Sequence, residues 1–535
     1  MSIILKVENL SVMAKKTMLL KSVSFEIQKG EVFALVGDSG SGKSLSSLAI
    51  MRLLPDALKI SAGDIVLNNQ SIFSISEFEM QKIRGRKIAM IFQEPMTALN
   101  PVMHIGEQVA EIIRLHLDLD EKLIQKKVVT LFEEVALKDA NERYYWYPHQ
   151  LSGGQKQRVM IAMALACEPE LLIADEPSTA LDVTIQAQVL ELLKEIQKKR
   201  ALSILFITHD LAVVAQMADT IAVMKEGEIV EVSKRETFFV SPKHPYTKSL
   251  LKDAMPSKET RRTSKESEDL LVVKDLKVHF PIKKGFFKRT QGYTKAVDGV
   301  SFSIKKGQTL ALVGESGSGK STIGTAVLRL LDIAEGSVVF KDVELLTLSQ
   351  KALQPFRKKI QIVFQDPFAA LNPRMTIGEI IREGMMSLGI GSKDKTIQDG
   401  YIKELLQKVD LEAEHMYRYP HEFSGGQRQR IGIARALAVE PELIICDEPT
   451  SALDVSVRAQ VLNLLKKLQN ESGLSYLFIT HDLSIIPMVA DEVAVMKEGK
   501  IIEQGRVKDV MMNPQHEYTK RLLEAAPKIP EVNNQ

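Results

Sequence analysis

Short apolar runs alternate with amphipathic stretches along this chain, the pattern expected of buried strands and the helices that cover them. The runs EVFALVG (31–37), LLIAD (171–175) and ILFIT (204–208) predict buried strands. Residues 184–199, TIQAQVLELLKEIQKK, place apolar side chains at steps of three and four, which predicts a helix. Continuous apolar strands that alternate with helices favour an α/β fold with a largely parallel sheet, because helices cover both of its faces.

The pattern occurs twice. The segment VSFEIQKGEVFALVGDSGSGKS, which starts at Val23, returns as VSFSIKKGQTLALVGESGSGKS at Val300. The segment that starts LSGGQ at Leu151 returns at Phe423, 272 residues later, with its polar residues almost unchanged. A fixed internal repeat of this length indicates two copies of one domain.

The stretch between the copies, residues 257–269, contains no apolar residue. It predicts a solvated linker, because nothing in it could offset the entropy of ordering the chain. A solvated helix is the alternative. We therefore predict a first domain at 1–256, a linker at 257–269 and a second domain at 270–535.

Composition excludes several classes of protein. The 535 residues are 45% hydrophobic and 26% charged with a formal net charge of +2, so we expect no general attraction to nucleic acid. The two cysteines, Cys167 and Cys446, lie inside apolar runs and exclude a disulfide framework. No apolar run approaches the roughly 18 residues that span a bilayer. The start, MSIILKVENLSV, lacks a signal-peptide block, so we expect a cytoplasmic chain whose membrane role depends on a partner.

Two glycine-rich loops, GDSGSGKS at 37–44 and GESGSGKS at 314–321, each follow a predicted strand and open a predicted helix. Glycines let successive backbone N–H groups wrap a phosphate at a helix N-terminus. We expect Lys43 and Lys320 to reach the β- and γ-phosphates of a nucleotide, and the Ser44 and Ser321 hydroxyls to bind Mg²⁺. A chance glycine turn could explain one such loop but not two in the same context. The glycines assigned to phosphate binding are Gly37, Gly40, Gly42, Gly314, Gly317 and Gly319.

Paired acids end a buried strand in each copy. Asp175 and Asp447 suit a Mg²⁺ ion, because the carboxyl end of a parallel strand is where such a sheet presents ligands. The adjacent Glu176 and Glu448 can polarise the attacking water. Strand-end capping would explain one acid but not the same pair twice.

Other polar residues close further strands. His209 and His481 each follow an apolar run, and we expect them to contact the γ-phosphate of the nucleotide. A lone histidine at a strand end is usually structural, but its duplication beside two phosphate loops favours the functional interpretation. Gln93 and Gln365 also follow strands, and their amides can bind Mg²⁺ or water.

The SGGQ segments precede good helices, so their serines are expected N-caps. Capping does not explain the two glycines, which allow close backbone approach to an anion. Because each copy already has a phosphate loop, we expect a face-to-face internal pseudo-dimer in which each SGGQ closes on the nucleotide of the other copy. The residues assigned to this contact are Ser152, Gly153, Gly154, Gln155, Ser424, Gly425, Gly426 and Gln427.

Together these motifs, with the ALD that follows each acid pair (180–182 and 452–454), resemble an ATP-binding cassette (ABC) ATPase that is complete in both copies. The resemblance covers nearly the whole chain. It implies two tandem P-loop nucleotide-binding domains, each with a mostly parallel core sheet, an antiparallel β subdomain and a helical subdomain. It also implies that ATP and Mg²⁺ are the cofactors.

The repeated element HPYT, which returns as HEYT, together with FQEPMTALNP and YPHQLSGGQ resembles the branch that imports peptides, dipeptides, oligopeptides and nickel. The segment FPIKKGFFKR, residues 280–289, is most similar to the Yej-type ATPase of a peptide importer that also admits microcin C. This resemblance implies two polytopic membrane permeases and an extracytoplasmic solute-binding protein as partners, with the chain peripheral on the cytoplasmic face of the inner membrane.

Two alternatives remain open at this stage. One is a soluble tandem-cassette ATPase that acts on ribosomes, although the linker here is shorter than such proteins typically have. The other is an importer of nickel or another small solute, because the cargo is chosen by subunits outside this chain.

Overall fold

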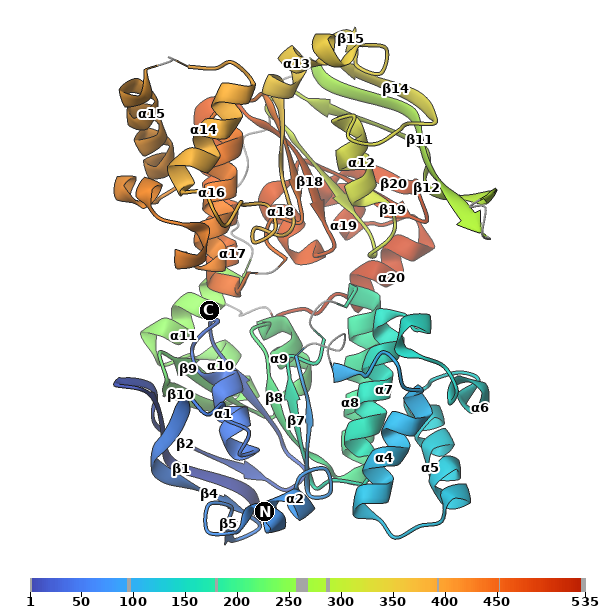
Figure 1. Cartoon of the computed structure of the whole chain (residues 1–535), viewed down its shortest axis with the longest axis vertical. Helices are drawn as coiled ribbons and strands as arrows, with labels where there is room; N and C mark the ends of the chain where they lie inside the picture. Colours follow the sequence, from blue (N-terminus) through green and yellow to red (C-terminus); the bar gives the residue numbers. More distant parts are fainter. Residues whose placement is uncertain are drawn as a thin grey trace. The chain divides into compact units, whose positions relative to one another are not determined.

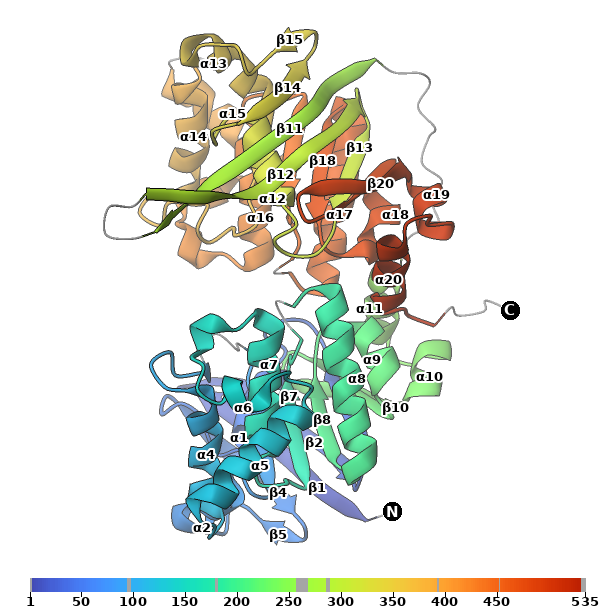
Figure 2. The same cartoon turned by 90° about the vertical axis from the view of Figure 1, so that its right-hand side faces the viewer.

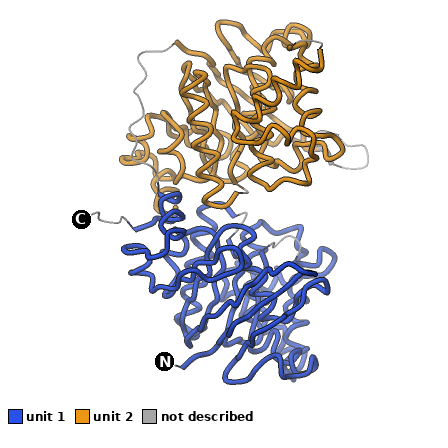
Figure 3. Tube along the Cα trace, turned by 90° about the vertical axis from the view of Figure 1, so that its left-hand side faces the viewer, with its two compact units in different colours: residues 1–255, 527–535 blue, residues 256–526 orange. Residues whose placement is uncertain are grey.

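The computed structural model describes residues 2–93, 98–178, 181–255, 268–284, 289–391, 394–451 and 453–530. The chain divides into two compact units, Met1–Met255 with Pro527–Gln535 and Pro256–Ala526, which Figure 3 shows in separate colours. Of the predicted linker, residues 257–267 lie outside the described residues. The predicted domain boundaries therefore stay a prediction.

Unit 1 contains a large and a small sheet (Figure 1). The large sheet is formed, from edge to edge, by β10 (Glu228–Lys234), β9 (Thr220–Lys225), β3 (Val32–Val36), β8 (Ser203–Ile207), β7 (Leu171–Asp175) and β6 (Ile88–Ile91). Adjacent strands in this sheet are parallel, except that β10 is antiparallel to β9. The small antiparallel sheet is formed, in order, by β2 (Thr17–Gln28), β1 (Ile3–Ala14), β4 (Leu58–Leu67) and β5 (Gln70–Ser71).

The helices of unit 1 include the two that the sequence predicts most clearly. The helix expected at 184–199 is α8 (Val183–Arg200), and the first phosphate loop opens α1 (Lys43–Ile50). The other helices are α2 (Glu77–Ile83), α4 (Ile105–His116), α5 (Glu121–Glu134), α6 (Ala140–Arg143), η1 (Pro148–Gln150), α7 (Gly153–Leu165), α9 (Leu211–Met217), α10 (Arg235–Val240) and α11 (Pro245–Ala254).

Unit 2 repeats this architecture. Its large sheet is formed, in order, by β20 (Lys500–Arg506), β19 (Glu492–Lys497), β13 (Thr309–Val313), β18 (Ser475–Thr480), β17 (Leu443–Asp447) and β16 (Ile360–Val363). Its small sheet is formed by β12 (Arg289–Lys305), β11 (Asp269–Lys284), β14 (Glu335–Phe340) and β15 (Val343–Glu344). Its helices are α12 (Lys320–Val327), α13 (Gln350–Lys359), α14 (Ile377–Ser387), α15 (Lys395–Lys408), η2 (Ala413–Tyr417), η3 (Pro420–Glu422), α16 (Gly425–Leu437), α17 (Val455–Ser472), η4 (Leu483–Ile485), α18 (Ile486–Val489), α19 (Val507–Met512) and α20 (Glu517–Ala525).

The central strands are buried on both faces, which explains why they read as continuous apolar runs. In β7, Leu171 and Ile173 join the core shared with the small sheet, whereas Leu172 and Ala174 join the core under the helices. Figure 1 shows the resulting layers in unit 1 side by side, with α7 and α8 on one side of β7 and β8 and β1 and β2 on the other, and Figure 2 views the same unit from the α8 side. The predicted α/β fold class, with a mostly parallel core sheet and an antiparallel sheet in each copy, is confirmed.

The parallel strands fix where the polar residues lie. Strands β3, β6, β7 and β8 run in the same direction, so the segments that follow them lie at one edge of the sheet. These segments carry the phosphate loop, Gln93, the acid pair and His209 of unit 1. The topology therefore brings together residues that are far apart in sequence.

Candidate functional site

Each phosphate loop folds around the ammonium group of its own lysine. Lys43 Nζ donates to the carbonyl oxygens of Gly37 and Asp38 at 2.8 and 2.9 Å. In unit 2, Lys320 Nζ donates to the corresponding carbonyls of Gly314 and Glu315 at 2.8 and 2.7 Å. Both lysines are buried, so the ammonium group is held at the base of the loop where a phosphate would neutralise it.

The first and last glycines of the loop are required by sterics. Gly37 has φ +152°, and a Cβ there would lie 2.1 Å from the carbonyl oxygen of Met224 in β9. Gly42 has φ +107° and caps α1, and a Cβ there would lie 2.5 Å from the Leu20 side chain. At Gly37 the clash would be with backbone, and at both positions φ has a value that residues with a side chain rarely adopt, so both positions favour glycine.

The loop serine and the strand-end aspartate meet in both units, as the sequence predicts for a metal site. Ser44 Oγ donates to Asp175 Oδ1 at 3.1 Å, and Ser321 Oγ donates to Asp447 Oδ1 at 2.8 Å. Burial raises the pKa of Asp175 to about 6, and burial likewise raises the pKa of Asp447. A buried carboxyl that is disfavoured as a bare anion is one that a cation would stabilise.

The second acid of each pair is held by two partners. In unit 1, Glu176 Oε1 lies 2.9 Å from His209 Nδ1, and Gln93 Nε2 donates to Glu176 Oε2 at 3.0 Å. The same arrangement recurs in unit 2, and the structure therefore brings the predicted glutamine, glutamate and histidine together twice. The distances in unit 2 are 3.1 Å from His481 Nδ1 to Glu448 Oε2 and 2.9 Å from Gln365 Nε2 to the same oxygen.

The charges of the unit 2 pair support each other. Burial raises the pKa of Glu448, but the hydrogen bond and charge of His481 outweigh it, so this pKa lies below its usual range. The hydrogen bond to Glu448 raises the pKa of His481 against the effect of burial. Because a carboxylate only accepts hydrogen bonds, Nδ1 of His481 carries a proton. A protonated ring would offer Nε2–H to an anion as well.

Both glutamates adopt a backbone conformation that is unusual for their residue type. Glu176 has φ +46° and Glu448 has φ +43°, in the left-handed region. Non-glycine residues in this region are uncommon, and they cluster at functional sites because the surrounding structure must hold them there. Neither the motif nor the strand pattern indicates this turn.

The SGGQ serines cap their helices as predicted. Ser152 Oγ accepts from Gln155 N at 3.4 Å while Gln155 Oε1 accepts from Ser152 N at 3.0 Å, which completes a capping box at α7. Ser424 and Gln427 form the same box at α16. The glutamine side chains therefore have a structural task that the sequence interpretation did not assign.

The second SGGQ glycine also has a packing role. A Cβ at Gly154 would lie 2.4 Å from Ile185 Cγ2 in α8, and one at Gly426 would lie 2.1 Å from Val457 Cγ1 in α17. A Cβ at Gly153 would meet Leu181 only at 3.8 Å. The nearest neighbours of the segment thus include the start of the helix after ALD, where Asp182 and Asp454 are the N-cap residues; Ala180 and Ala452 lie outside the described residues.

The residues at the sheet edge fit a hard divalent cation. Carboxylate, hydroxyl and amide oxygens are the donors Mg²⁺ prefers, and it usually keeps only one or two protein ligands beside waters and substrate phosphates. Asp175, Ser44 and Gln93 offer this set in unit 1, and Asp447, Ser321 and Gln365 offer it in unit 2. Among the described residues no group of three or more His, Cys, Asp or Glu side chains could hold a metal ion by itself.

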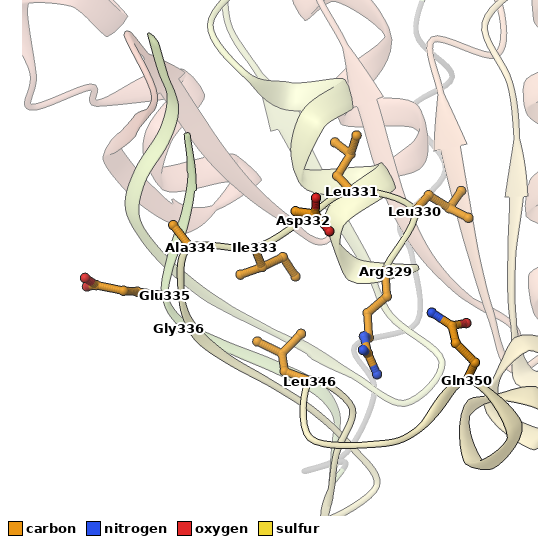
Figure 4. A pocket seen from close by; sticks show the side chains of 10 residues that line it. All are labelled: Arg329, Leu330, Leu331, Asp332, Ile333, Ala334, Glu335, Gly336, Leu346 and Gln350. Carbon is orange, nitrogen blue, oxygen red and sulfur yellow. The ribbon is translucent and has the colours of Figure 1, made fainter. Parts of the chain in front are cut away.

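A separate hollow of about 400 Å³ lies in unit 2 beside the end of α12 (Figure 4). Its lining runs from Arg329 to Gly336 and includes Leu346 and Gln350. The corresponding connection of the first copy is longer, because the offset between the copies falls from 277 at Gly37 and Gly314 to 273 at the strand ends Leu67 and Phe340. The hollow contains none of the predicted site residues.

Each unit has a glycine loop at a helix start, an acid pair at the end of β7 or β17, and a glutamine and a histidine around the second acid. These features define each unit as a P-loop nucleotide-binding cassette. Comparison with known proteins places the chain more narrowly. The sequence model of the family described as "ABC transporter" matches residues 20–179 and 297–451. A second model, "Oligopeptide/dipeptide transporter, C-terminal region", matches residues 230–275 and 502–534. The chain belongs to the ABC transporter family, as an ATPase of the peptide-importer branch.

Curated relatives match over nearly the full length. The chain is 46% identical to the "Glutathione import ATP-binding protein GsiA" of Salmonella typhimurium over 95% of this chain and 86% of that protein. It is also 46% identical to the protein of that name from Escherichia coli K12, over 98% of this chain and 89% of the relative. The predicted family and branch are confirmed, whereas the Yej-type likeness, whose segment includes 285–288 outside the described residues, stays a prediction.

A solved structure shares the tandem fold. The archaeal ribosome recycling factor aABCE1, in complex with the ribosomal stalk protein aP1, matches with a TM-score of 0.60 over 92% of this chain and 89% of that chain. Its sequence identity is 20%, so this likeness shows the fold alone. The sequence relatives do not favour the alternative of an ATPase that acts on ribosomes.

Proposed function

We propose that this chain is the ATP-hydrolysing subunit of an importer for glutathione or other short peptides. The observation that carries this proposal is the 46% identity to glutathione import ATP-binding proteins over 95% of the chain. The C-terminal oligopeptide/dipeptide element, present after each cassette, points to the same class of cargo.

Each unit has the groups that hydrolysis of ATP needs. In unit 1, Lys43 and the loop glycines would hold the phosphates, and Ser44, Asp175 and Gln93 would hold Mg²⁺, which would neutralise charge between the phosphates. Glu176 would polarise the attacking water and His209 would contact the γ-phosphate. In unit 2 the corresponding residues are Lys320, Ser321, Asp447, Gln365, Glu448 and His481.

We further propose two composite sites. In each one, the phosphate loop of one unit would be closed by the SGGQ of the other, so ATP would hold the halves together and hydrolysis would release them. Within unit 1, the serine and first glycine of SGGQ sit at the exposed start of α7. A helix N-terminus with small residues is suited to receive a phosphate from outside.

The partners would be two polytopic membrane permeases and, indirectly, an extracytoplasmic solute-binding protein, with no nucleic acid. No helix in the described part of the chain is long and apolar enough to cross a bilayer, so the permeases would supply the membrane path. The helices after each glutamine, α4 and α5 in unit 1 and α14 and α15 in unit 2, would receive them. The chain would then lie peripherally on the cytoplasmic face of the inner membrane.

The test is uptake in cells that lack this chain. Labelled glutathione, a dipeptide, a longer peptide and Ni²⁺ are each offered to cells complemented with the wild-type chain or with Glu176→Gln plus Glu448→Gln. Uptake of glutathione or a peptide by the wild type alone supports the proposal. The tagged chain should also co-purify with two polytopic membrane proteins after gentle detergent extraction.

Two outcomes would contradict it. Uptake of Ni²⁺ but of none of the three peptides would show that the importer class is right and the cargo wrong. Co-purification with ribosomal proteins and no membrane protein would overturn the transport function and leave only the ATPase chemistry.

A further inference from the structure

The repeated HPYT and HEYT elements start the helix that follows each cassette. His244 caps α11 through Nδ1, which accepts from Tyr246 N at 3.2 Å. His516 caps α20 in the same way, with Tyr518 N at 3.1 Å. The histidine of the element therefore shapes the first helical turn and fixes the tyrosine two residues later.

The tyrosine bonds to the phosphate loop of its own unit. Tyr246 Oη donates to Asp38 Oδ2 at 2.6 Å and accepts from Asp38 N at 3.2 Å, across 208 residues of sequence. In unit 2, Tyr518 Oη accepts from Glu315 N at 3.4 Å. Asp38 and Glu315 are the residues that directly follow the first glycine of each loop.

A carboxylate, buried in unit 1 and half-buried in unit 2, attaches the element to the neighbouring strand. Glu231 in β10 accepts from the backbone N–H groups of Lys243 and His244 at 3.0 and 2.9 Å. Glu503 in β20 accepts from the N–H groups of Gln515 and His516 at 2.7 and 3.1 Å. Charge-assisted hydrogen bonds of this kind are among the stronger ones in proteins, so they hold the start of the helix that carries the tyrosine in place.

A cation also faces each tyrosine ring. Lys225 Nζ lies 5.1 Å from the ring centroid of Tyr246, and Lys497 Nζ lies 5.2 Å from that of Tyr518. Both lysines end the strand next to the phosphate-loop strand, so a cation faces the ring at the same place in both units. The recurrence of the whole arrangement argues against a chance contact.

The residue that the tyrosine holds is also the one that holds the phosphate-binding lysine. Lys43 Nζ donates to the Asp38 carbonyl at 2.9 Å, and Lys320 Nζ donates to the Glu315 carbonyl at 2.7 Å. We propose that Tyr246 and Tyr518 are positioning residues that fix the first turn of each phosphate loop, so that the element after each cassette sets the affinity of that cassette for ATP. This inference rests on the proposed ATP-binding role of the loops.

The physical effect would be pre-organisation. Without the hydroxyl, Asp38 loses both a donor and an acceptor, and the peptide that carries its carbonyl gains freedom that must be removed again when phosphate binds. A hydrogen bond to a charged group contributes enough for about a tenfold effect on an equilibrium. The loss would appear in binding of ATP rather than in the rate of hydrolysis once ATP is bound.

The experiment measures ATP binding to the full-length chain, with one loop disabled at a time. In a Lys320→Ala background the measured binding comes from the unit 1 loop alone. There, Tyr246→Phe should raise the Kd for ATP about tenfold and leave kcat at saturating ATP nearly unchanged. Tyr518→Phe in a Lys43→Ala background should raise the Kd in the same direction by a smaller factor, because its hydroxyl accepts from a neutral backbone N–H at 3.4 Å. Tyr145→Phe is the matched control, since its hydroxyl accepts from Gln125 at 3.0 Å on the surface of unit 1 and should leave the Kd unaltered.

Each outcome decides something. An unchanged Kd in Tyr246→Phe overturns the inference, as does a loss confined to the thermal unfolding midpoint without nucleotide. If Tyr246→Phe folds poorly, Asp38→Ala removes the other side of the 2.6 Å contact, and the double variant should then cost no more than the larger single one. Failure of the wild-type chain to bind ATP at all would instead overturn the proposed function.

Discussion

His209 Nδ1 lies 2.9 Å from Glu176 Oε1, and the other oxygen of that carboxylate accepts from the Gln93 amide at 3.0 Å. The glutamate is thus oriented from the ends of two other strands. A group that must aim one oxygen at a water gains from having both of its oxygens located. In unit 2 the same two partners hold Glu448, but His481 Nδ1 and the Gln365 amide both lie at Oε2, at 3.1 and 2.9 Å.

Replacement of both glutamates should separate ATP binding from hydrolysis. Glu176→Gln plus Glu448→Gln keeps the side-chain shape and an acceptor oxygen but removes the base, so the rate of ATP hydrolysis should fall by about 10² to 10⁴. ATP affinity should remain within a few-fold of wild type. Single-turnover hydrolysis and equilibrium binding on the same preparation measure the two quantities, and a wild-type hydrolysis rate would show that another group polarises the water.

Paired substitutions can show whether the sites are composite. Aspartate is also a good N-cap, so Ser152→Asp and Ser424→Asp should preserve α7 and α16 while placing a negative charge beside any phosphate. In a Lys43→Ala background the composite site of the unit 1 loop is already lost, so Ser424→Asp, which belongs to that site, should remove no further binding. Ser152→Asp should damage the remaining site, which contains the unit 2 loop.

The readout is the amount of tightly bound ATP per chain. We expect about one in Lys43→Ala, about one in Lys43→Ala plus Ser424→Asp, and almost none in Lys43→Ala plus Ser152→Asp. The reverse order of the two double variants would mean that each SGGQ serves the phosphate loop of its own unit. Circular dichroism of the double variants confirms that the helices persist.

Gly154→Ala should destabilise unit 1 through a specific clash. The new Cβ would lie 2.4 Å from Ile185 Cγ2, so either α7 or α8 must shift, at a cost of about 1–3 kcal/mol in the free energy of unfolding. Adding Ile185→Ala opens space and should recover part of that loss. Gly153→Ala, where the nearest atom is at 3.8 Å, serves as the control in denaturant unfolding.

Acid should weaken the anchoring of α4. Glu107 accepts from Tyr144 Oη at 2.6 Å and from Arg114 Nη1 at 3.0 Å, and the bond from Tyr144 is the main reason that the pKa of Glu107 lies below its usual value. A depressed folded-state pKa stabilises the fold above the unfolded-state pKa of about 4.3, and this stabilisation is lost as the pH falls through the folded-state pKa.

The matching measurement is hydrogen exchange in α4 as a function of pH. Glu107→Gln should reduce protection of α4 at pH 7, and the difference from wild type should shrink as the pH falls toward and below 4. Glu111→Gln, on the exposed side of the same helix, is the control. A difference that stays constant across this range would mean that the Glu107 charge does not anchor the helix.

The grouping of these residues at one edge of the sheet could be predicted because those assigned to phosphate and Mg²⁺ are contiguous in sequence or end a strand. The conformation of a loop such as GDSGSGKS can be recognised from contiguous residues. An apolar run that stops at Asp175 indicates the carboxyl edge of a parallel sheet. Repetition then distinguishes function from chance. The strand order itself was not needed for these assignments, since all of the strands concerned run the same way.

Other features could not be predicted because they depend on contacts between distant segments. Nothing near Tyr246 in the sequence indicates that its hydroxyl meets Asp38, and nothing near Gly154 indicates Ile185 as its neighbour. The two copies also differ at positions outside the motifs. The half-buried Arg435 donates to the Ala370 carbonyl at 2.6 Å in unit 2, and the corresponding residue of the first copy is Met163.

The left-handed backbone at Glu176 and Glu448 has a consequence for anyone who engineers this protein. Glycine, and to a lesser degree asparagine, adopts such a conformation at lower cost, by about 1 kcal/mol. Glu176→Gly or Glu448→Gly would gain that amount but lose the hydrogen bonds of the carboxylate to its glutamine and histidine, so the two effects on the free energy of unfolding oppose each other. A melting curve therefore says little about these two positions, and selection there has to be made on turnover.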